Sequence, residues 1–252
     1  MLSLSKPARL ACRDRLRDSR ARASADAEGF QEILFAIERL GTAALDKVTA
    51  LGSYEGRLRR IAESSPLAFC IPSKYRWLFT PFDILFGLVR VARNDALHQG
   101  AYARHLTSHA IELSLILEDA LTTDSATVAD FMVKGVVCAE LWQPLAYLRQ
   151  TMLANSFSFL PVKLADGNWA LVSDCALALA LRRCDQKRDD TLGLTLEKAI
   201  ETKLIEPQPT TPIAPDLDVG ASLTDMKGRP VLVHHPMHHS EVIGIITSFD
   251  LL

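Results

Sequence analysis

Apolar residues recur at helical spacing along the first half of the chain. From Phe30 onward they fall at positions i, i+3, i+4 and i+7, the period of one buried helix face. Residues 52–53, Gly-Ser, end this pattern, and a shorter helix is expected over residues 54–63. Pro81 is suited to the first turn of a helix, and the same period continues after it. With a further helix expected over about residues 95–121, this half predicts a helical bundle.

The pattern changes to short extended segments after residue 122. Four apolar runs follow, at residues 160–164, 169–172, 230–233 and 242–246. Asp166 and Gly167 separate the first two runs and are a strong hairpin signal, whereas a longer turn separates the last two. Each hairpin ends in a hydroxyl residue, Ser173 or Thr247, before a helical patch. We interpret this half as an internal repeat of a strand-hairpin-helix unit, which gives an α+β protein overall.

Composition and charge fit two globular modules. Hydrophobic residues make up 48% and charged residues 23% of the 252, which excludes a disordered or collagen-like chain. The net charge of -2 argues against coating of nucleic acid through bulk electrostatics. That charge divides unevenly, as +3 over residues 1–120 and -5 over residues 121–252. Opposite signs indicate two domains with different partners.

Cysteine usage and hydropathy indicate a cytoplasmic protein. The five cysteines are scattered and form no C-x-x-C motif, so neither a disulfide framework nor a zinc knuckle is expected. The first residues lack the apolar core of a secretory signal. The most apolar stretch, residues 82–91, is about half as long as a bilayer span and contains Asp83 and Arg90. We therefore expect no transmembrane helix and no membrane partner.

Residues 1–25 are strongly basic. They contain only two acidic residues, Asp14 and Asp18, beside seven basic ones: Lys6, Arg9, Arg13, Arg15, Arg17, Arg20 and Arg22. One interpretation is a solvated N-terminal helix, and the other is an arm that touches nucleic acid. We predict a basic arm over residues 1–25, followed by a helical domain over residues 26–122.

The second half resembles a tandem pair of CBS domains, the cystathionine beta-synthase motif. In a first repeat of about residues 124–184, the resemblance rests on residues 128–132, a helix over residues 144–155, and residues 157–162. In a second repeat of about residues 194–252, it rests on the ending from Gly244 to Leu252. The resemblance implies a pseudo-twofold module with two clefts, in which many relatives bind AMP, ATP or S-adenosylmethionine.

The resemblance also implies which residues would touch such an adenosine ligand. The family pattern sets Ser or Thr, and an Asp three positions later, against ribose and phosphate, and Thr247 and Asp250 match it. In the first repeat Ala176 stands three positions after the serine, so one cleft is expected to be weak or empty. The implied contact set is Thr247, Asp250, Ser173, Asp174, Ile246, Pro230 and Val231. The alternative is that Thr247 only caps the final short helix.

The segment from Arg93 to His98 resembles the R-x4-H signature of the HEPN superfamily, four-helix domains that include many ribonucleases. The resemblance spans about residues 30–121. Metal-free RNA cleavage needs a group that moves a proton and a fixed cation, roles suited to His98 and Arg93 with Asn94 orienting them. A five-residue step turns a helix by roughly 140°, so Arg93 is expected before the regular helix, or else the site is composite across a dimer. The alternative is a structural role for His98 within the bundle.

A histidine-rich turn lies between the last two apolar runs. Its imidazoles belong to His234, His235, His238 and His239. Such a turn either binds a borderline metal ion or is a solvated bend that responds to pH. One loop seldom supplies tetrahedral geometry alone, so no metal cofactor is expected.

Three functions are consistent with these features. The first is a regulatory protein whose CBS pair binds an adenosine ligand and controls the helical module, which contacts RNA or another protein. The second is a metal-independent ribonuclease that uses Arg93 and His98 under CBS control. The third is a structural homodimer with vestigial sites. Whether the chain is an enzyme is left open by the sequence.

Overall fold

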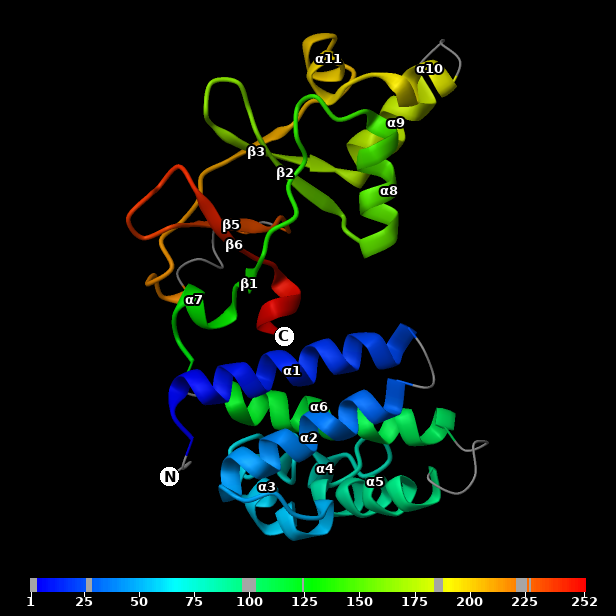
Figure 1. The fold of residues 1–252 in the computed structure, drawn as a ribbon, viewed down its shortest axis with the longest axis vertical. Coiled ribbons are helices and arrows are strands. Elements are labelled where there is room, and N and C mark those ends of the chain that lie inside the picture. Colours follow the sequence, from blue (N-terminus) through cyan, green and yellow to red (C-terminus); the bar gives the residue numbers. More distant parts are fainter. Residues whose placement is uncertain are drawn as a thin grey trace. The chain divides into compact units, whose positions relative to one another are not determined.

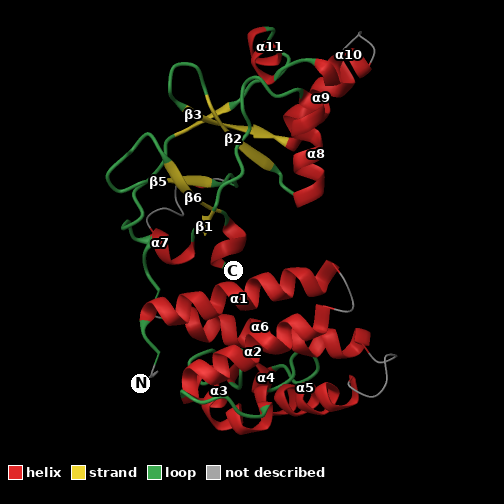
Figure 2. Ribbon diagram, in the orientation of Figure 1, coloured by secondary structure: helices red, strands yellow, loops and turns green. Residues whose placement is uncertain are grey.

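The computed structural model describes residues 4–25, 29–96, 103–123, 125–183, 188–220, 226 and 228–252. The chain divides into two compact units, residues 1–125 and residues 126–252, which are described separately below. The change of unit lies close to the predicted change of sequence pattern after residue 122. The helices and small antiparallel sheets make this an α+β protein (Figure 2).

The first unit is built from helices packed around α6. In chain order its elements are α1 (Lys6–Ala25), α2 (Phe30–Leu45), the 3-10 turn η2 (Leu51–Tyr54), α3 (Glu55–Ala62), α4 (Cys70–Lys74), α5 (Phe82–Ala96) and α6 (Ala103–Thr122). Helix α6 packs against α1, α2, α3 and α5 (Figure 1). The apolar period predicted from Phe30 forms the buried face of α2, where Ile33, Ile37 and Leu40 are fully buried.

Two helix boundaries differ from the sequence prediction, and one predicted helix is confirmed. Helix α2 ends at Leu45, because Asp46 adopts a left-handed conformation with φ 53°, and Val48 is therefore exposed instead of buried. The predicted helix over residues 95–121 was wrong at its start, since Asp95 belongs to α5 and α6 begins at Ala103. The helix expected at residues 54–63 is confirmed as α3.

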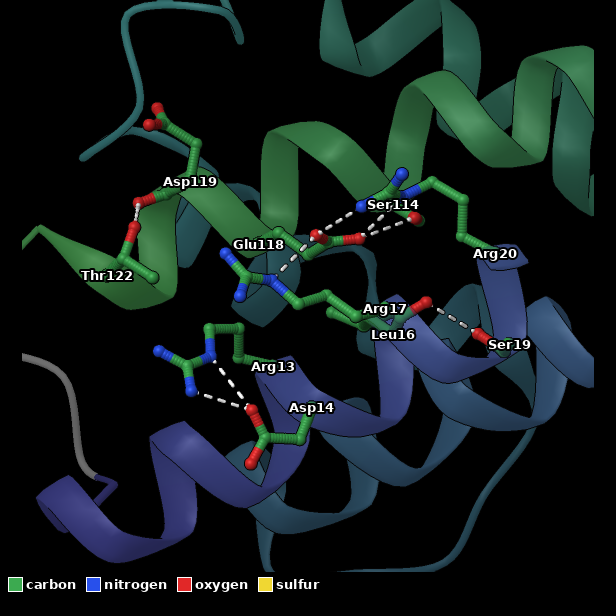
Figure 3. A network of polar contacts seen from close by, with 10 residues as sticks. All are labelled: Arg13, Asp14, Leu16, Arg17, Ser19, Arg20, Ser114, Glu118, Asp119 and Thr122. Atoms are coloured by element: carbon green, nitrogen blue, oxygen red, sulfur yellow. Dashed lines mark hydrogen bonds and ion pairs between the residues drawn. The ribbon is translucent and has the colours of Figure 1, made fainter. Parts of the chain in front are cut away.

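The predicted basic arm is instead an integral helix of the first unit. Cys12, Leu16 and Ala23 of α1 belong to its core, and α1 packs on both α2 and α6. The charges of α1 do not keep it in solvent, because Arg17 and Arg20 turn toward α6. Figure 3 shows Arg17 and Arg20 reaching Glu118, a carboxylate with only 7% of its side chain exposed.

The second unit contains two three-stranded antiparallel sheets. Its elements are α7 (Val128–Phe131), β1 (Val133–Lys134), α8 (Leu145–Asn155), β2 (Phe159–Lys163), β3 (Trp169–Ser173), α9 (Asp174–Arg183), α10 (Arg188–Gly193), α11 (Leu196–Glu201), β4 (Gln208–Thr210), β5 (Val231–His234), β6 (Val242–Ile246) and the 3-10 turn η3 (Ser248–Leu251). The hairpins β2–β3 and β5–β6 confirm the four predicted strands. Gly167 supplies the positive φ, 86°, that the first hairpin turn requires.

Each sheet takes its third strand from the other repeat. The sheet orders are β1-β6-β5 and β2-β3-β4. Strand β1 precedes the first hairpin in the chain but pairs with β6 of the second, with Val133 opposite Ile245 (Figure 1). Strand β4 precedes the second hairpin but pairs with β3 of the first, with Trp169 opposite Thr210. The two repeats are therefore joined by backbone pairing as well as by side-chain packing.

The backbone hydrogen bonds repeat about a pseudo-twofold relation. Val128 N at the start of α7 donates to Leu217 O, and Leu196 N at the start of α11 donates to Gln143 O, both at 2.9 Å. Two more pairs of bonds match in the same way. Ala129 N donates to Pro215 O, as Glu197 N donates to Leu141 O. Val219 N donates to Ala126 O, as Leu145 N donates to Leu194 O. The helix that opens each repeat is thus bound to the other repeat in the same way.

Candidate ligand cleft

A cleft of about 500 Å³ lies in the second unit where segments of both repeats meet. The first repeat contributes residues that follow β1 and residues that enter β2, and the second contributes the start of β5 and the end of β6. Its described lining residues are Val133, Gly135, Val136, Val137, Ser156, Phe157, Ser158, Phe159, Pro161, Met226, Gly228, Arg229, Pro230, Ile245, Thr247, Ser248, Phe249 and Asp250. Most of the lining is apolar, and its charged groups are Arg229 and Asp250, which is the character of a site for a partly aromatic, partly polar ligand.

Thr247 and Asp250 lie together on the cleft wall and bind each other. The Asp250 carboxylate oxygen Oδ2 accepts hydrogen bonds from Thr247 N at 2.7 Å and from Thr247 Oγ1 at 2.8 Å. This is a capping box, which fixes the turn η3 immediately after β6. The two residues that the sequence singled out therefore cap a short helix, as the alternative interpretation held, and line a cleft as well.

A capping box of the same kind occurs at the start of the first repeat, at residues that are not part of the described cleft lining. Asp130 Oδ2 accepts from Thr127 N at 3.0 Å and from Ala126 N at 3.1 Å, and Asp130 is only 3% exposed. Asp130 is thus a structural carboxylate. Asp250 differs because it lies on the cleft lining and is half-buried.

Arg229 brings a positive charge to the cleft. It follows the left-handed Gly228, with φ 77°, and its backbone N–H donates to Met226 O at 2.6 Å. Its guanidinium Nη1 lies 3.5 Å from Gln208 Oε1 of β4, so the side chain reaches the strand that completes the β2-β3-β4 sheet. Arg229 could not be predicted as a site residue, because the sequence alone gives no sign that the residue before Pro230 faces the cleft.

The structure separates the remaining predicted contact residues. Pro230 lines the cleft, but Ile246 and Val231 point into a small core cluster and are 0% and 6% exposed. Ser173 is buried, and its Oγ accepts from Ala176 N at 3.0 Å, which caps α9. Asp174 is exposed and lines a different depression, between α8 and α9. Only three of the seven predicted residues therefore share the cleft.

The proposed ribonuclease residues lie partly outside the described structure. Arg93 is in the last turn of α5, and its Nε lies 2.9 Å from Glu38 Oε1 of α2. His98 falls outside the described residues, and so does the side chain of Asn94. The ion pair gives Arg93 a role within the helical bundle, and its catalytic role stays a prediction from the sequence.

The histidine turn contains two pairs of neighbouring imidazoles. The ring centroids of His234 and His239 are 4.3 Å apart, and those of His235 and His238 are 5.0 Å apart. His235 Nδ1 accepts hydrogen bonds from the backbone N–H groups of Met237 and His238. Across the described residues, no group of three or more His, Cys, Asp or Glu side chains is placed to hold a metal ion.

The helices of the described residues include none that combines the length and apolar character needed to cross a membrane.

The solved structures that resemble this chain, reported below, each cover half of it. No protein-family model matches the chain, and no curated protein matches its sequence. Among solved structures, the chain is similar to a putative acetoin utilization protein from Vibrio cholerae, at 19% identity and a TM-score of 0.40, over 50% of this chain and 86% of that one.

Two further similar structures are described with ligands. The CBS domain pair of protein MJ0100, in complex with 5-methylthioadenosine and S-adenosyl-L-methionine, is 19% identical with a TM-score of 0.38, over 50% of this chain and 95% of that one. CBSX2, in complex with AMP, is 19% identical with a TM-score of 0.38, over 50% of this chain and 92% of that one.

Proposed function

We propose that residues 126–252 form a CBS pair that binds an adenosine ligand in the cleft described above and thereby regulates the helical unit. The observation that carries the proposal is the position of Asp250. Its carboxylate is held by hydrogen bonds from Thr247 and lines a largely apolar cleft, and Arg229 lines the same cleft. The pseudo-twofold backbone bonds between α7, α11 and the opposite repeats support the assignment to a CBS pair.

Each part of an adenosine ligand has a matching group on the lining. Phe157 and the 82% exposed Phe249 offer aromatic faces for the adenine base. A carboxylate such as Asp250 accepts both ribose hydroxyls, and its capping bonds hold it in place for that purpose. The guanidinium of Arg229 is suited to a phosphate or to the carboxylate of S-adenosylmethionine.

Regulation follows from the composition of the cleft, because its walls come from both repeats. A ligand that contacts Val136 and Phe157 of the first repeat together with Asp250 of the second stabilises the arrangement in which these walls are close. Such a ligand shifts the population of the module toward that arrangement by its differential affinity. The output would be a change in how the helical unit contacts RNA or a protein, in a chain that also associates as a homodimer.

Calorimetry with AMP, ADP, ATP and S-adenosylmethionine tests this proposal on the full chain. We expect one of the four to bind, and Asp250→Asn and Arg229→Met each to weaken binding at least about tenfold. Arg182→Met, which removes an exposed arginine of α9 outside the cleft lining, is the matched control and should bind normally. Absence of heat with all four compounds, or equal affinity in both cleft variants, would contradict the proposal.

Ribonuclease action by Arg93 and His98 is the second function that the sequence suggests. Its test is cleavage of a single-stranded RNA by the full chain and by His98→Ala. Cleavage that is lost in the variant supports the R-x4-H assignment, and cleavage that survives it rejects that assignment.

A further inference from the structure

Helix α5 has a second apolar face that the described residues leave uncovered. One face lies in the core of the first unit and consists of Phe82, Leu85, Phe86, Val89 and Ala92. On the opposite side Ile84, Leu88 and Val91, spaced i, i+4 and i+7, are 56%, 40% and 54% exposed. An amphipathic surface helix needs only one apolar stripe, so the second one indicates another surface packed against it.

The loop that leads into α5 adds exposed aromatic and aliphatic side chains. Trp77 and Leu78 are 78% and 70% exposed, and Tyr75 and Phe79 are exposed as well. With the outer stripe of α5 these side chains expose on the order of 700 Å² of largely apolar surface, if a whole aromatic side chain offers about 150–250 Å². Stable dimers of standard size bury about 800 Å² on each partner, so this surface has the extent that one such interface needs.

Gly87 lies midway along the outer stripe, at a position that the described residues leave open. A Cβ atom built there meets no other atom within 4 Å, whereas one at Gly41 would clash with the Tyr54 ring. Glycine weakens a helix interior, so it is favoured there when another backbone or side chain comes close. At Gly87 the space is open on the side that Ile84, Leu88 and Val91 share.

We propose that α5 pairs antiparallel with α5 of a second copy of this chain, about a twofold axis between Gly87 and Leu88. Antiparallel pairing centred there places Ile84 opposite the partner's Val91, and Leu88 over the notch at the partner's Gly87. The stripe is therefore complementary to itself, because a large leucine faces a small glycine and the branched Ile84 faces a branched valine. A twofold interface requires this self-complementarity, because one surface patch must serve both subunits.

The flanking charges select the antiparallel direction. Asp83 and Arg90 lie seven residues apart, which places them on the same flank of the stripe, and both are half-exposed. Antiparallel pairing sets this flank beside the same flank of the partner helix and so brings Asp83 near the partner's Arg90, whereas parallel pairing would place the two flanks on opposite sides of the interface and leave these charges apart. Within the chain Asp83 contacts Arg59 at 2.9 Å and Arg90 contacts Glu55 at 3.2 Å, so the dimer would extend two existing ion pairs.

Sedimentation equilibrium of the full chain tests this interface with substitutions at two positions that face each other across it. Ile84→Lys and Val91→Glu are each expected to halve the mass of the wild-type assembly, with a dissociation constant raised at least about tenfold. The double variant is expected to restore much of the association, because each introduced lysine then faces the partner's introduced glutamate. Val48→Glu changes an 83% exposed valine outside α5 and should leave the mass unchanged.

Gly87→Ala provides a second variant that keeps the helix intact. It should leave the helical circular dichroism unchanged or stronger and yet weaken association, which separates loss of the interface from loss of the fold. Unchanged mass in both single variants would overturn the proposal, and failure of the double variant to recover would overturn the antiparallel register. A wild-type chain that is monomeric and instead binds vesicles of phosphatidylcholine and phosphatidylserine would show that the stripe contacts lipid, and would also overturn it.

Discussion

Arg20 of α1 binds Glu118 of α6 through two parallel hydrogen bonds, Nε to Oε1 and Nη2 to Oε2, each 3.0 Å long. Arg17 adds an ion pair to Oε2 at 3.5 Å, and Ser114 Oγ donates to Oε1 at 3.2 Å (Figure 3). One buried carboxylate therefore ties a basic helix to the bundle. This arrangement explains why a segment whose composition indicates a solvated arm is part of the core.

Glu118→Gln should destabilise the first unit by roughly 2–3 kcal/mol. The amide cannot balance the two arginines, and the loss falls below the about 3–5 kcal/mol of a fully buried pair because Arg20 is 32% exposed. Urea unfolding measures the change. Glu32→Gln is the matched control: its pair with Arg22 spans 3.8 Å between well-exposed side chains, so its loss should stay below about 1 kcal/mol. Equal effects of the two variants would contradict the anchoring role of Glu118.

Gly41→Ala should cost about 1–3 kcal/mol, because the new methyl group would clash with the Tyr54 ring. Tyr54 cannot move aside easily, since its hydroxyl is bonded to Thr42 Oγ1 at 2.9 Å and to Thr49 N at 2.7 Å. Thermal unfolding measures the loss. Gly56→Ala in α3 meets no atom within 4 Å and should be neutral or stabilising by about 0.4–1 kcal/mol. A stabilising Gly41→Ala would show that the contact between α2 and Tyr54 is looser than described.

The described cysteines should differ in their rates of alkylation. Burial raises the pKa of the Cys12 thiol, and burial followed by the nearby Glu140 raises the pKa of the Cys138 thiol. Because the thiolate is the nucleophile, both should react slowly near neutral pH, while the exposed Cys70 and Cys175 react first. Peptide mapping after timed treatment with iodoacetamide gives the order. Labelling of Cys12 as early as Cys70 would show that α1 opens readily from the bundle.

Asp166 should hold its charge to lower pH than an ordinary aspartate. Its pKa is lowered chiefly by the hydrogen bond from the Asn168 backbone N–H, and then by the one from the Asn168 side chain. The folded pKa lies below the unfolded one, so this stabilisation is present above the unfolded pKa and is lost as pH falls through the folded pKa. An NMR titration of the side-chain carboxyl group measures the pKa of Asp166 directly. Asn168→Ala keeps the backbone bond and should raise the pKa only part of the way, so an unchanged titration would contradict the side-chain contribution.

Much of the fold could be predicted from local sequence signals. The β2–β3 hairpin follows from Asp166-Gly167, where turn chemistry and neighbouring apolar runs agree, and Gly167 does take the positive φ. The early end of α2 at Asp46 could not be predicted, because a non-glycine left-handed residue gives little signal. The buried stripe of α1 is present in the sequence at Cys12, Leu16, Ser19 and Ala23, but it is mostly made of small residues beside many charges.

Part of the candidate site could be predicted from the sequence, namely Thr247, Asp250 and Pro230. Thr247 and Asp250 follow from a short local pattern, and the structure places both on the cleft. Phe157 and Arg229 could not be selected, because they meet there only through the exchange of β1 and β4 between the repeats. Ser173 was selected by analogy with Thr247, but it faces inward as the cap of α9.

The strand exchange fixes an order of events during synthesis. The first unit has its own core within residues 1–125 and can complete it while the rest of the chain is still being made. In the second unit Val133 must wait for Ile245, more than a hundred residues later, so β1 has no partner until β6 has left the ribosome. Pairing over such a separation is slow. A ribosome stalled late in the message would therefore carry a finished helical unit beside an open strand edge, the state in which this protein is most exposed to aggregation.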